Sequence, residues 1–205
     1  MAAVNRRQAR EWALQLLFQI DANPARDLAP VLSDFWVQQF RLRQDAEEEI
    51  QALAGQAPDA PERAPAPASP ETAAETLAPQ RFRDFTEKLV RGVTDNLDAI
   101  DSRVARYTEN WPLHRMGGVD RNVLRLAVFE MFFDEQTPPI VVINEAVDLA
   151  KYFSSSESGR FVNGILDRAC KDVARPAREP GRQPTGDRRP SPARARPAPG
   201  AAGRR

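Results

Sequence analysis

The chain has 205 residues, of which 41% are hydrophobic, and one cysteine. It is therefore long enough for one buried core, and it cannot form an intrachain disulfide. The formal net charge of zero hides an asymmetry, because residues 176–205 carry eight arginines against two carboxylates and the remainder must sum to −6. No apolar run approaches the roughly 18 residues of a membrane span, and no secretion signal opens the sequence, so we expect a cytoplasmic protein without membrane association.

The first patterned segment, residues 6–20, is predicted to form a helix that packs on the rest of the protein. Asn5 is a residue type that caps helix N-termini, and Gln8 lies where a capping box has its return partner. The apolar positions of the segment fall on one helical face, opposite a strip of polar side chains. The apolar set is Ala9, Trp12, Ala13, Leu16, Leu17 and Ile20, and the polar set is Gln8, Glu11, Gln15 and Gln19.

Three arginines, Arg6, Arg7 and Arg10, lie in the opening turns of this helix. The helix dipole places about half a positive charge there, so carboxylates rather than cations would stabilise the helix. Phosphate oxygens, in contrast, are favoured both by a helix N-terminus and by clustered guanidinium groups. We therefore predict a nucleic-acid surface. The alternative is that these are ordinary surface arginines, with Arg7 and Glu11 forming a weak i,i+4 pair.

Helical periods continue along the chain, and no segment alternates in the manner of a strand bounded by hairpin turns. We predict an all-α fold, a compact bundle of about six to seven helices in two packed subdomains. Asp120 is expected to open one helix, the serines at 154–156 to cap another, and Gly164 to permit close helix packing. The further helices are expected at 30–40 with a solvated extension to 50, at 81–104, from 120 to before Pro138, at 140–153 and at about 157–173.

Two stretches are expected to be disordered. Residues 55–79 hold six prolines among small and polar residues, and the part after Arg175 repeats Pro, Arg, Gly and Ala. We expect one domain at 1–175, interrupted by the insert, followed by a basic tail at 176–205.

No arrangement of catalytic residues is evident. His114 is the single histidine and Cys170 the single cysteine, which excludes the usual structural zinc ligand sets. Glu145 and Asp148, three residues apart, are better explained as a structural pair than as an acid–base pair. Gly117–Gly118 lacks the strand that precedes a dinucleotide-binding loop. We predict a protein that is not an enzyme and has no cofactor or metal.

Four blocks stand out in the second half of the chain. They are Asn110-Trp111-Pro112-Leu113, the run from Val119 to Ala127, the run from Ile143 to Lys151, and the run from Phe161 to Asp167. In this order and spacing they resemble the NusB family of bacterial transcription antitermination factors. The opening run of arginines resembles the arginine-rich motif of the same family, and the resemblance covers residues 5–42 and 81–173.

The resemblance implies an RNA-binding protein that recognises the boxA element of nascent rRNA transcripts together with ribosomal protein S10 (NusE), and acts indirectly on the RNA polymerase elongation complex. It implies RNA contacts at Arg6, Arg7 and Arg10. An S10-facing surface would include five residues: Phe18, Asp120, Arg121, Glu157 and Phe161. An acidic body suits a basic ribosomal partner. A homodimer is a further possibility that the sequence leaves open.

Alternatives remain at several of these positions. Phe18 and Phe161 could be core residues, and Asp120 could be an N-cap. Arg125, among apolar neighbours, is predicted to be a buried-pair or snorkelling arginine rather than an RNA contact. For the whole chain, the alternatives are a protein-binding helical scaffold and an accessory domain related to rRNA cytosine methyltransferases. The latter would need an attached cofactor-binding domain and a region with a nucleophilic cysteine, whereas we expect residues 176–205 to be a disordered tail.

Overall fold

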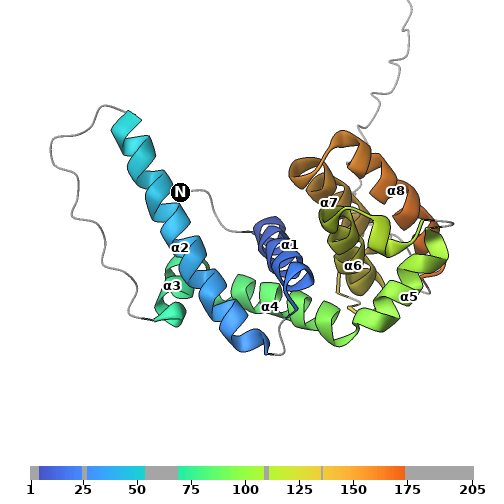
Figure 1. Cartoon of the computed structure of the whole chain (residues 1–205), viewed down its shortest axis with the longest axis horizontal. Helices are drawn as coiled ribbons and strands as arrows, with labels where there is room; N and C mark the ends of the chain where they lie inside the picture. Colours follow the sequence, from blue (N-terminus) through green and yellow to red (C-terminus); the bar gives the residue numbers. More distant parts are fainter. Residues whose placement is uncertain (1–4, 25–26, 54–68, 109–110, 135, 174–205) are drawn as a thin grey trace, which may run out of the picture.

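The structure is a computed structural model that describes residues 5–24, 27–53, 69–108, 111–134 and 136–173 (Figure 1). Over these residues the protein is all-α, as predicted from the helical periods. The elements are α1 (Arg6–Ala22), α2 (Leu28–Leu53), α3 (Pro70–Leu77), α4 (Gln80–Asp95), α5 (Leu97–Tyr107), a 3-10 turn η1 (Leu113–Arg115), α6 (Gly118–Phe132), α7 (Pro139–Phe153) and α8 (Ser156–Cys170). In this part of the chain no helix is both long and apolar enough to cross a membrane.

The helices form two packed groups, which confirms the predicted subdomains (Figure 1). In the first group α1 packs on α4, and α2 packs on α3 and crosses α1. In the second group α7 packs on both α6 and α8, and α5 packs on α6 and α8. Helices α1 and α4 also pack on α6, so the two groups share one continuous core.

Helix α1 begins where the sequence predicts. The side chain of Asn5 accepts a hydrogen bond from the backbone N–H of Gln8 at 2.9 Å, which satisfies one of the N–H groups that lack a partner inside the helix. The expected apolar face is buried except at Ile20, which is partly buried, and the ring of Trp12 lies edge-on to Trp36 of α2 at 5.3 Å. The helix is therefore fixed on the fold.

Part of the predicted disordered insert is instead a packed helix. Ser69 caps α3, Pro70 occupies its first turn, and the side chains of Ala73, Ala74 and Leu77 are buried. Small side chains allow α3 to pack against α2, and alanine and proline content alone does not reveal this. The prediction was therefore wrong for residues 70–77. Residues 54–68 and the expected disordered tail at 176–205 lie outside the described residues.

The long helix predicted at 81–104 is two helices, α4 and α5. At Asn96 the backbone leaves helical geometry (φ −115°, ψ 21°), and the side-chain amide of Asn96 donates to the carbonyl of Gly92 at 2.8 Å. Asparagine competes in this way with the backbone N–H groups that would continue a helix. The break turns α5 towards the second group of helices.

The role predicted for Gly164 was wrong, because a Cβ added there would meet no atom of the described residues within 4 Å. Close packing depends on other glycines. A Cβ at Gly92 would overlap the ring of Phe129, and one at Gly159 would lie 2.6 Å from the side chain of Lys151. These two positions bring α4 close to α6 and α8 close to α7.

Candidate nucleic-acid interface

The N-terminal end of α1 carries two accessible arginines. Arg6 is exposed, and its guanidinium lies over the ring of Phe85 at 5.2 Å. No carboxylate forms an ion pair with Arg6 among the described residues. Arg7 is 39% exposed; its Nη1 donates to Asp148 at 3.1 Å and its Nε to Glu11 at 3.4 Å. Both guanidinium groups can reach a ligand outside the protein.

Arg10 is placed differently, because its side chain is only 3% exposed. Its Nε and Nη2 donate to the two carboxylate oxygens of Glu130 on α6, at 2.9 and 2.7 Å. Glu145 lies 3.8 Å from its Nη1. Burial alone would lower the pKa of Arg10, but the hydrogen bonds and negative charge of Glu130 outweigh it and hold this pKa above its usual value. In this conformation Arg10 joins α1 to α6 and is not accessible to a phosphate.

The contacts around Arg10 fix the position of Arg6 and Arg7. The guanidinium of Arg10 lies 5.3 Å from the centre of the Phe85 ring, and the hydroxyl of Thr86 donates to the carbonyl of Ala9 at 3.2 Å. Helix α4 and helix α6 thus hold the first turns of α1 from two sides. A fixed helix end of this kind is suited to position a phosphate backbone.

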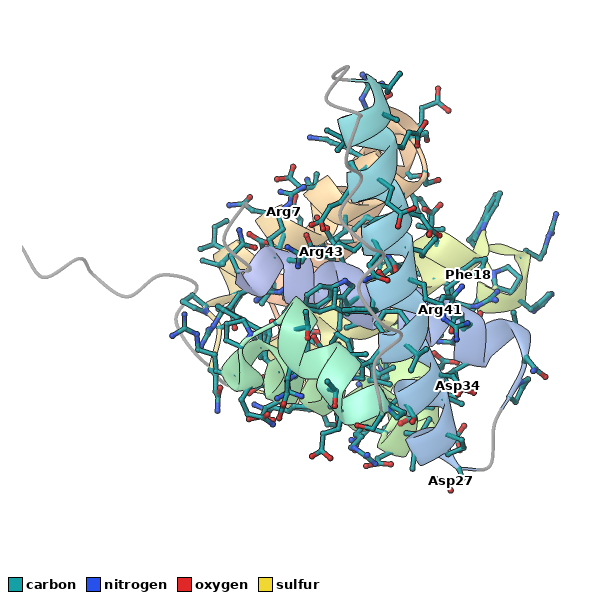
Figure 2. All side chains as sticks on the ribbon, turned by 90° about the vertical axis from the view of Figure 1, so that its left-hand side faces the viewer. Arg7, Phe18, Asp27, Asp34, Arg41 and Arg43 are labelled. Carbon is teal, nitrogen blue, oxygen red and sulfur yellow. The ribbon has the colours of Figure 1, made fainter. Side chains whose placement is uncertain are left out.

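Phe18 lies on the same helix, on the other side of the crossing with α2 from Arg7 (Figure 2). Its side chain is 46% exposed, so the alternative that Phe18 is a core residue was wrong. The ring rests on Gly118, where an added Cβ would come within 2.8 Å of it. The adjoining hollow, of about 360 Å³, is lined among others by Leu14, Leu42 and Phe153. Phe18 is therefore available to a partner.

Three of the residues proposed to face the partner come together at the start of α6. Asp120, Glu157 and Phe161 line one hollow of about 390 Å³, together with Trp111 and Arg115. Glu157 is exposed, whereas Phe161 is half-buried and packs partly on the core, so its core interpretation holds in part. Trp111 is 51% exposed, and sequence reasoning used it only as part of a motif.

Asp120 is not the N-cap of α6. The helix begins at Gly118, so Asp120 lies in its first turn, where a carboxylate interacts favourably with the helix dipole. Its Oδ2 accepts a hydrogen bond from the hydroxyl of Ser158 at 3.2 Å, which links α6 to α8. Its Oδ1 is buried and has no hydrogen-bond partner among the residues that the structure describes. Ser155, in contrast, caps α8 as predicted by accepting from the N–H of Ser158.

Arg121 points into the fold. Its Nη2 and Nε bind Asp21 at the end of α1, and its Nη1 donates to the carbonyls of Leu113 and Met116. Arg125 binds the other oxygen of Asp21 at 2.7 Å and binds Asp101 with two further hydrogen bonds of 2.8 Å. The prediction of a buried-pair arginine at 125 is confirmed.

Asp21 is the centre of this network. Burial alone would raise the pKa of Asp21, but the hydrogen bonds from Arg121 and Arg125 outweigh burial and hold the pKa below its usual value. Asp21 therefore stays charged and joins the C-terminal end of α1 to α6.

The fold and this helix end define an all-helical protein that presents a fixed, cationic helix N-terminus. The model of the NusB family matches residues 50–171, and the chain belongs to this family. That match begins after α1. Several relatives match more of the chain, and two of them, both named transcription antitermination protein NusB, serve as examples. The one from Pelotomaculum thermopropionicum is 36% identical over 80% of this chain and 88% of its own length. The one from Syntrophotalea carbinolica is 36% identical over 84% of this chain and 98% of its own length.

Solved structures show the same architecture. The NusB of T. maritima aligns with a TM-score of 0.60 at 29% identity, over 85% of this chain and 96% of that one. A structure of the antitermination factors NusB and NusE in complex with dsRNA aligns with a TM-score of 0.53 at 23% identity, over 81% and 96%, and shows the likeness of fold. The family is one of transcription antitermination factors and not a known family of enzymes.

Proposed function

We propose that this chain binds the boxA element of nascent rRNA transcripts together with ribosomal protein S10 (NusE), and so supports antiterminated transcription of rRNA. Membership of the NusB family supports this proposal, and the fixed arginine end of α1 is the observation that carries it. The structural likeness to a NusB that was solved with NusE and RNA supports it further. The complex would act on RNA polymerase indirectly, in the cytoplasm, where bacterial transcription takes place.

Within this proposal Arg6 and Arg7 bind the RNA backbone. Arg6 has an open guanidinium, and Arg7 can exchange a half-exposed carboxylate partner, Asp148, for a phosphate. The resemblance also places Arg10 at the RNA. In this proposal the buried pair of Arg10 with Glu130 instead fixes α1 on α6 and so keeps Arg6 and Arg7 in position. The salt slope, which is the slope of log K of RNA binding against log[salt], would be about −1.4 for two direct contacts, at roughly −0.7 per phosphate of single-stranded RNA.

S10 is proposed to bind where Phe18, Asp120, Glu157 and Phe161 lie. An exposed aromatic ring beside carboxylates suits a basic partner. Arg121 belongs to this region, and its contacts with Asp21 and the turn before α6 give it the role of holding that surface in place. Arg6 and Phe18 are twelve residues apart on α1, about 18 Å along the helix, so RNA and S10 bound there would lie side by side, and contacts between them would couple the two binding steps.

The experiment is a mobility-shift titration of single-stranded boxA-type RNA with the full chain, with and without purified S10. We expect S10 to tighten RNA binding, and RNA to tighten S10 binding by the same factor. The double variant Arg6→Ala/Arg7→Ala should lose most RNA binding, whereas Phe18→Ala should lose the effect of S10 and keep the binding to RNA alone. Absence of binding to boxA-type RNA even with S10 present would reject the proposal in favour of a protein-binding scaffold.

A homodimer is the remaining proposal for the exposed apolar surface around Phe18 and Leu42. A dimer that used this surface would compete with S10. Sedimentation velocity of the free chain, repeated with S10, tests it: a dimer should dissociate as S10 binds.

A further inference from the structure

A hollow of about 250 Å³ lies on the side of Arg6 that faces α4. It combines cationic and aromatic side chains from α1 and α4 with one residue of the connection between α6 and α7. The lining residues are Arg6, Arg81, Phe82, Asp84, Phe85, Lys88 and Gln136. Neither the family resemblance nor the sequence patterns assign a function to α4.

Two arginines of this hollow are held in the same manner. The guanidinium of Arg6 lies over the ring of Phe85 at 5.2 Å, and that of Arg81 lies over Phe82 at 4.7 Å. Both arginines are exposed, and neither has a carboxylate ion-pair partner among the described residues. A ring beneath a guanidinium restricts its motion but leaves its N–H edge and its outer face open. The edge can bind a phosphate, and the outer face can stack on a base.

Two carboxylates, Asp84 and Asp134, bear on the charge of this hollow. Asp84 accepts a hydrogen bond from the side-chain amide of Gln80 at 2.6 Å. Asp134 is 4% exposed and lies 2.8 Å from the ammonium of Lys88, which is itself 41% exposed. Lys88 thus pairs with the buried carboxylate of Asp134. The amide of Gln80 leaves the charge of Asp84 in place, but Arg6 and Arg81 outnumber it, so the net charge of the hollow is positive.

We propose that this hollow is a nucleotide subsite that extends the RNA path from Arg6 along α4. Arg81 binds the backbone phosphate and stacks on the adjoining base, and Arg6 is shared between this subsite and the arginine end. Single-stranded RNA is the class of ligand that fits, because it offers a phosphate and an unstacked base one nucleotide apart. This inference rests on the proposed function and adds that the RNA runs from the N-terminal end of α1 along α4.

The test compares Arg81→Ala with Arg91→Ala by fluorescence anisotropy. Arg91 is an exposed arginine of the same helix, but it lines a different hollow and lies 3.9 Å from Glu87, so it is a matched control for loss of one charge from α4. The probes are a labelled boxA-type RNA and the same RNA extended by oligouridine at both ends. For the extended RNA, Arg81→Ala should weaken binding about three- to tenfold and reduce the salt slope by about 0.7. Arg91→Ala should change neither.

Comparing the short and the extended RNA distinguishes the contribution of this subsite from that of Arg6 and Arg7 at the N-terminal end of α1. With the short RNA the effect of Arg81→Ala should shrink, while Arg6→Ala/Arg7→Ala should weaken both probes. Arg81→Lys should keep the salt slope and lose part of the affinity, because lysine keeps the charge without the stacking plane.

An unchanged affinity of Arg81→Ala for both RNAs, while Arg6→Ala/Arg7→Ala weakens them, would overturn the subsite and leave the proposed function intact. If no variant changes RNA binding, both fail. A loss of S10 binding in Arg81→Ala without any loss of RNA binding would assign the hollow to a protein and also overturn the subsite. Thermal unfolding of each variant verifies that this exposed substitution leaves the fold intact.

Discussion

The two ends of α1 use arginine in opposite ways. At the C-terminal end Asp21 binds Arg121 and Arg125, so the arginines of α6 are satisfied within the fold. At the N-terminal end Arg10 is satisfied in the same way by Glu130, but Arg6 and Arg7, one turn earlier, reach solvent. Both ends are tied to α6, and one of them retains cationic groups that an outside anion can bind. Arginines whose carboxylate partners are buried or half-buried therefore hold the helices together. Arg6 has no carboxylate partner among the described residues and Arg7 has an exposed one, so these two arginines can bind an outside anion.

The largest expected effect concerns the buried pair. Arg10→Met would leave Glu130 buried without its bidentate partner, and removal of one member of such a pair costs about 3–5 kcal/mol of unfolding free energy. Arg6→Met should stay within about 0.5 kcal/mol, because its side chain is exposed. Urea unfolding of both variants measures the difference. The double variant Arg10→Met/Glu130→Leu should recover much of the loss, and equal destabilisation by Arg6→Met and Arg10→Met would refute the distinction.

A smaller effect is expected at the other end, as a function of pH. The folded-state pKa of Asp21 lies below its usual value of 3.8, so this carboxylate stabilises the fold at pH values above 3.8, and the stabilisation is lost as pH falls through the lowered pKa. Asp21→Asn should therefore be less stable than the parent by about 2 kcal/mol at pH 6, with the gap closing below pH 3.8. Asp34→Asn, at an exposed carboxylate of α2, is the control and should show no such gap (Figure 2). A difference in stability between Asp21→Asn and the parent that does not narrow between pH 4 and pH 2 would contradict this account.

The smallest effect concerns the exposed partner of Arg7. Asp148 is 49% exposed, so Asp148→Asn should change stability by less than about 1 kcal/mol. It should nevertheless tighten binding of boxA-type RNA about two- to threefold, because a carboxylate no longer competes with phosphate for Arg7 and one negative charge beside the RNA is removed. Filter binding at low salt measures the change. Unchanged RNA affinity of this variant at low salt would place the RNA away from Arg7.

The sequence reveals features that depend on near neighbours. The cap at Asn5, the apolar face of α1 and the serine cap of α8 all follow from residues within one or two turns, and the structure confirms them. The inward role of Arg125 was also predictable, because a charge among apolar residues needs a buried partner.

Features that depend on distant partners were missed. The burial of Arg10 depends on Glu130, 120 residues away, and an arginine in a basic cluster gives no sign of such a partner. Two signals were nevertheless present: Arg10 shares a helix face with Ala13 and Leu17, and Glu130 interrupts an apolar run. Helix α3 was missed because its short alanine-rich face is stable only against α2. Likewise, the cationic hollow on α4 forms only when α1 and α4 pack together.

The most direct test of the central claim is the salt dependence of RNA binding by the Arg6→Ala/Arg7→Ala variant, measured against Arg91→Ala. Loss of two phosphate contacts should reduce the slope of log K against log[salt] by about 1.4, whereas Arg91→Ala should keep the parent slope. A variant without Arg6 and Arg7 that keeps the parent slope and affinity would show that the RNA does not bind at the N-terminal end of α1.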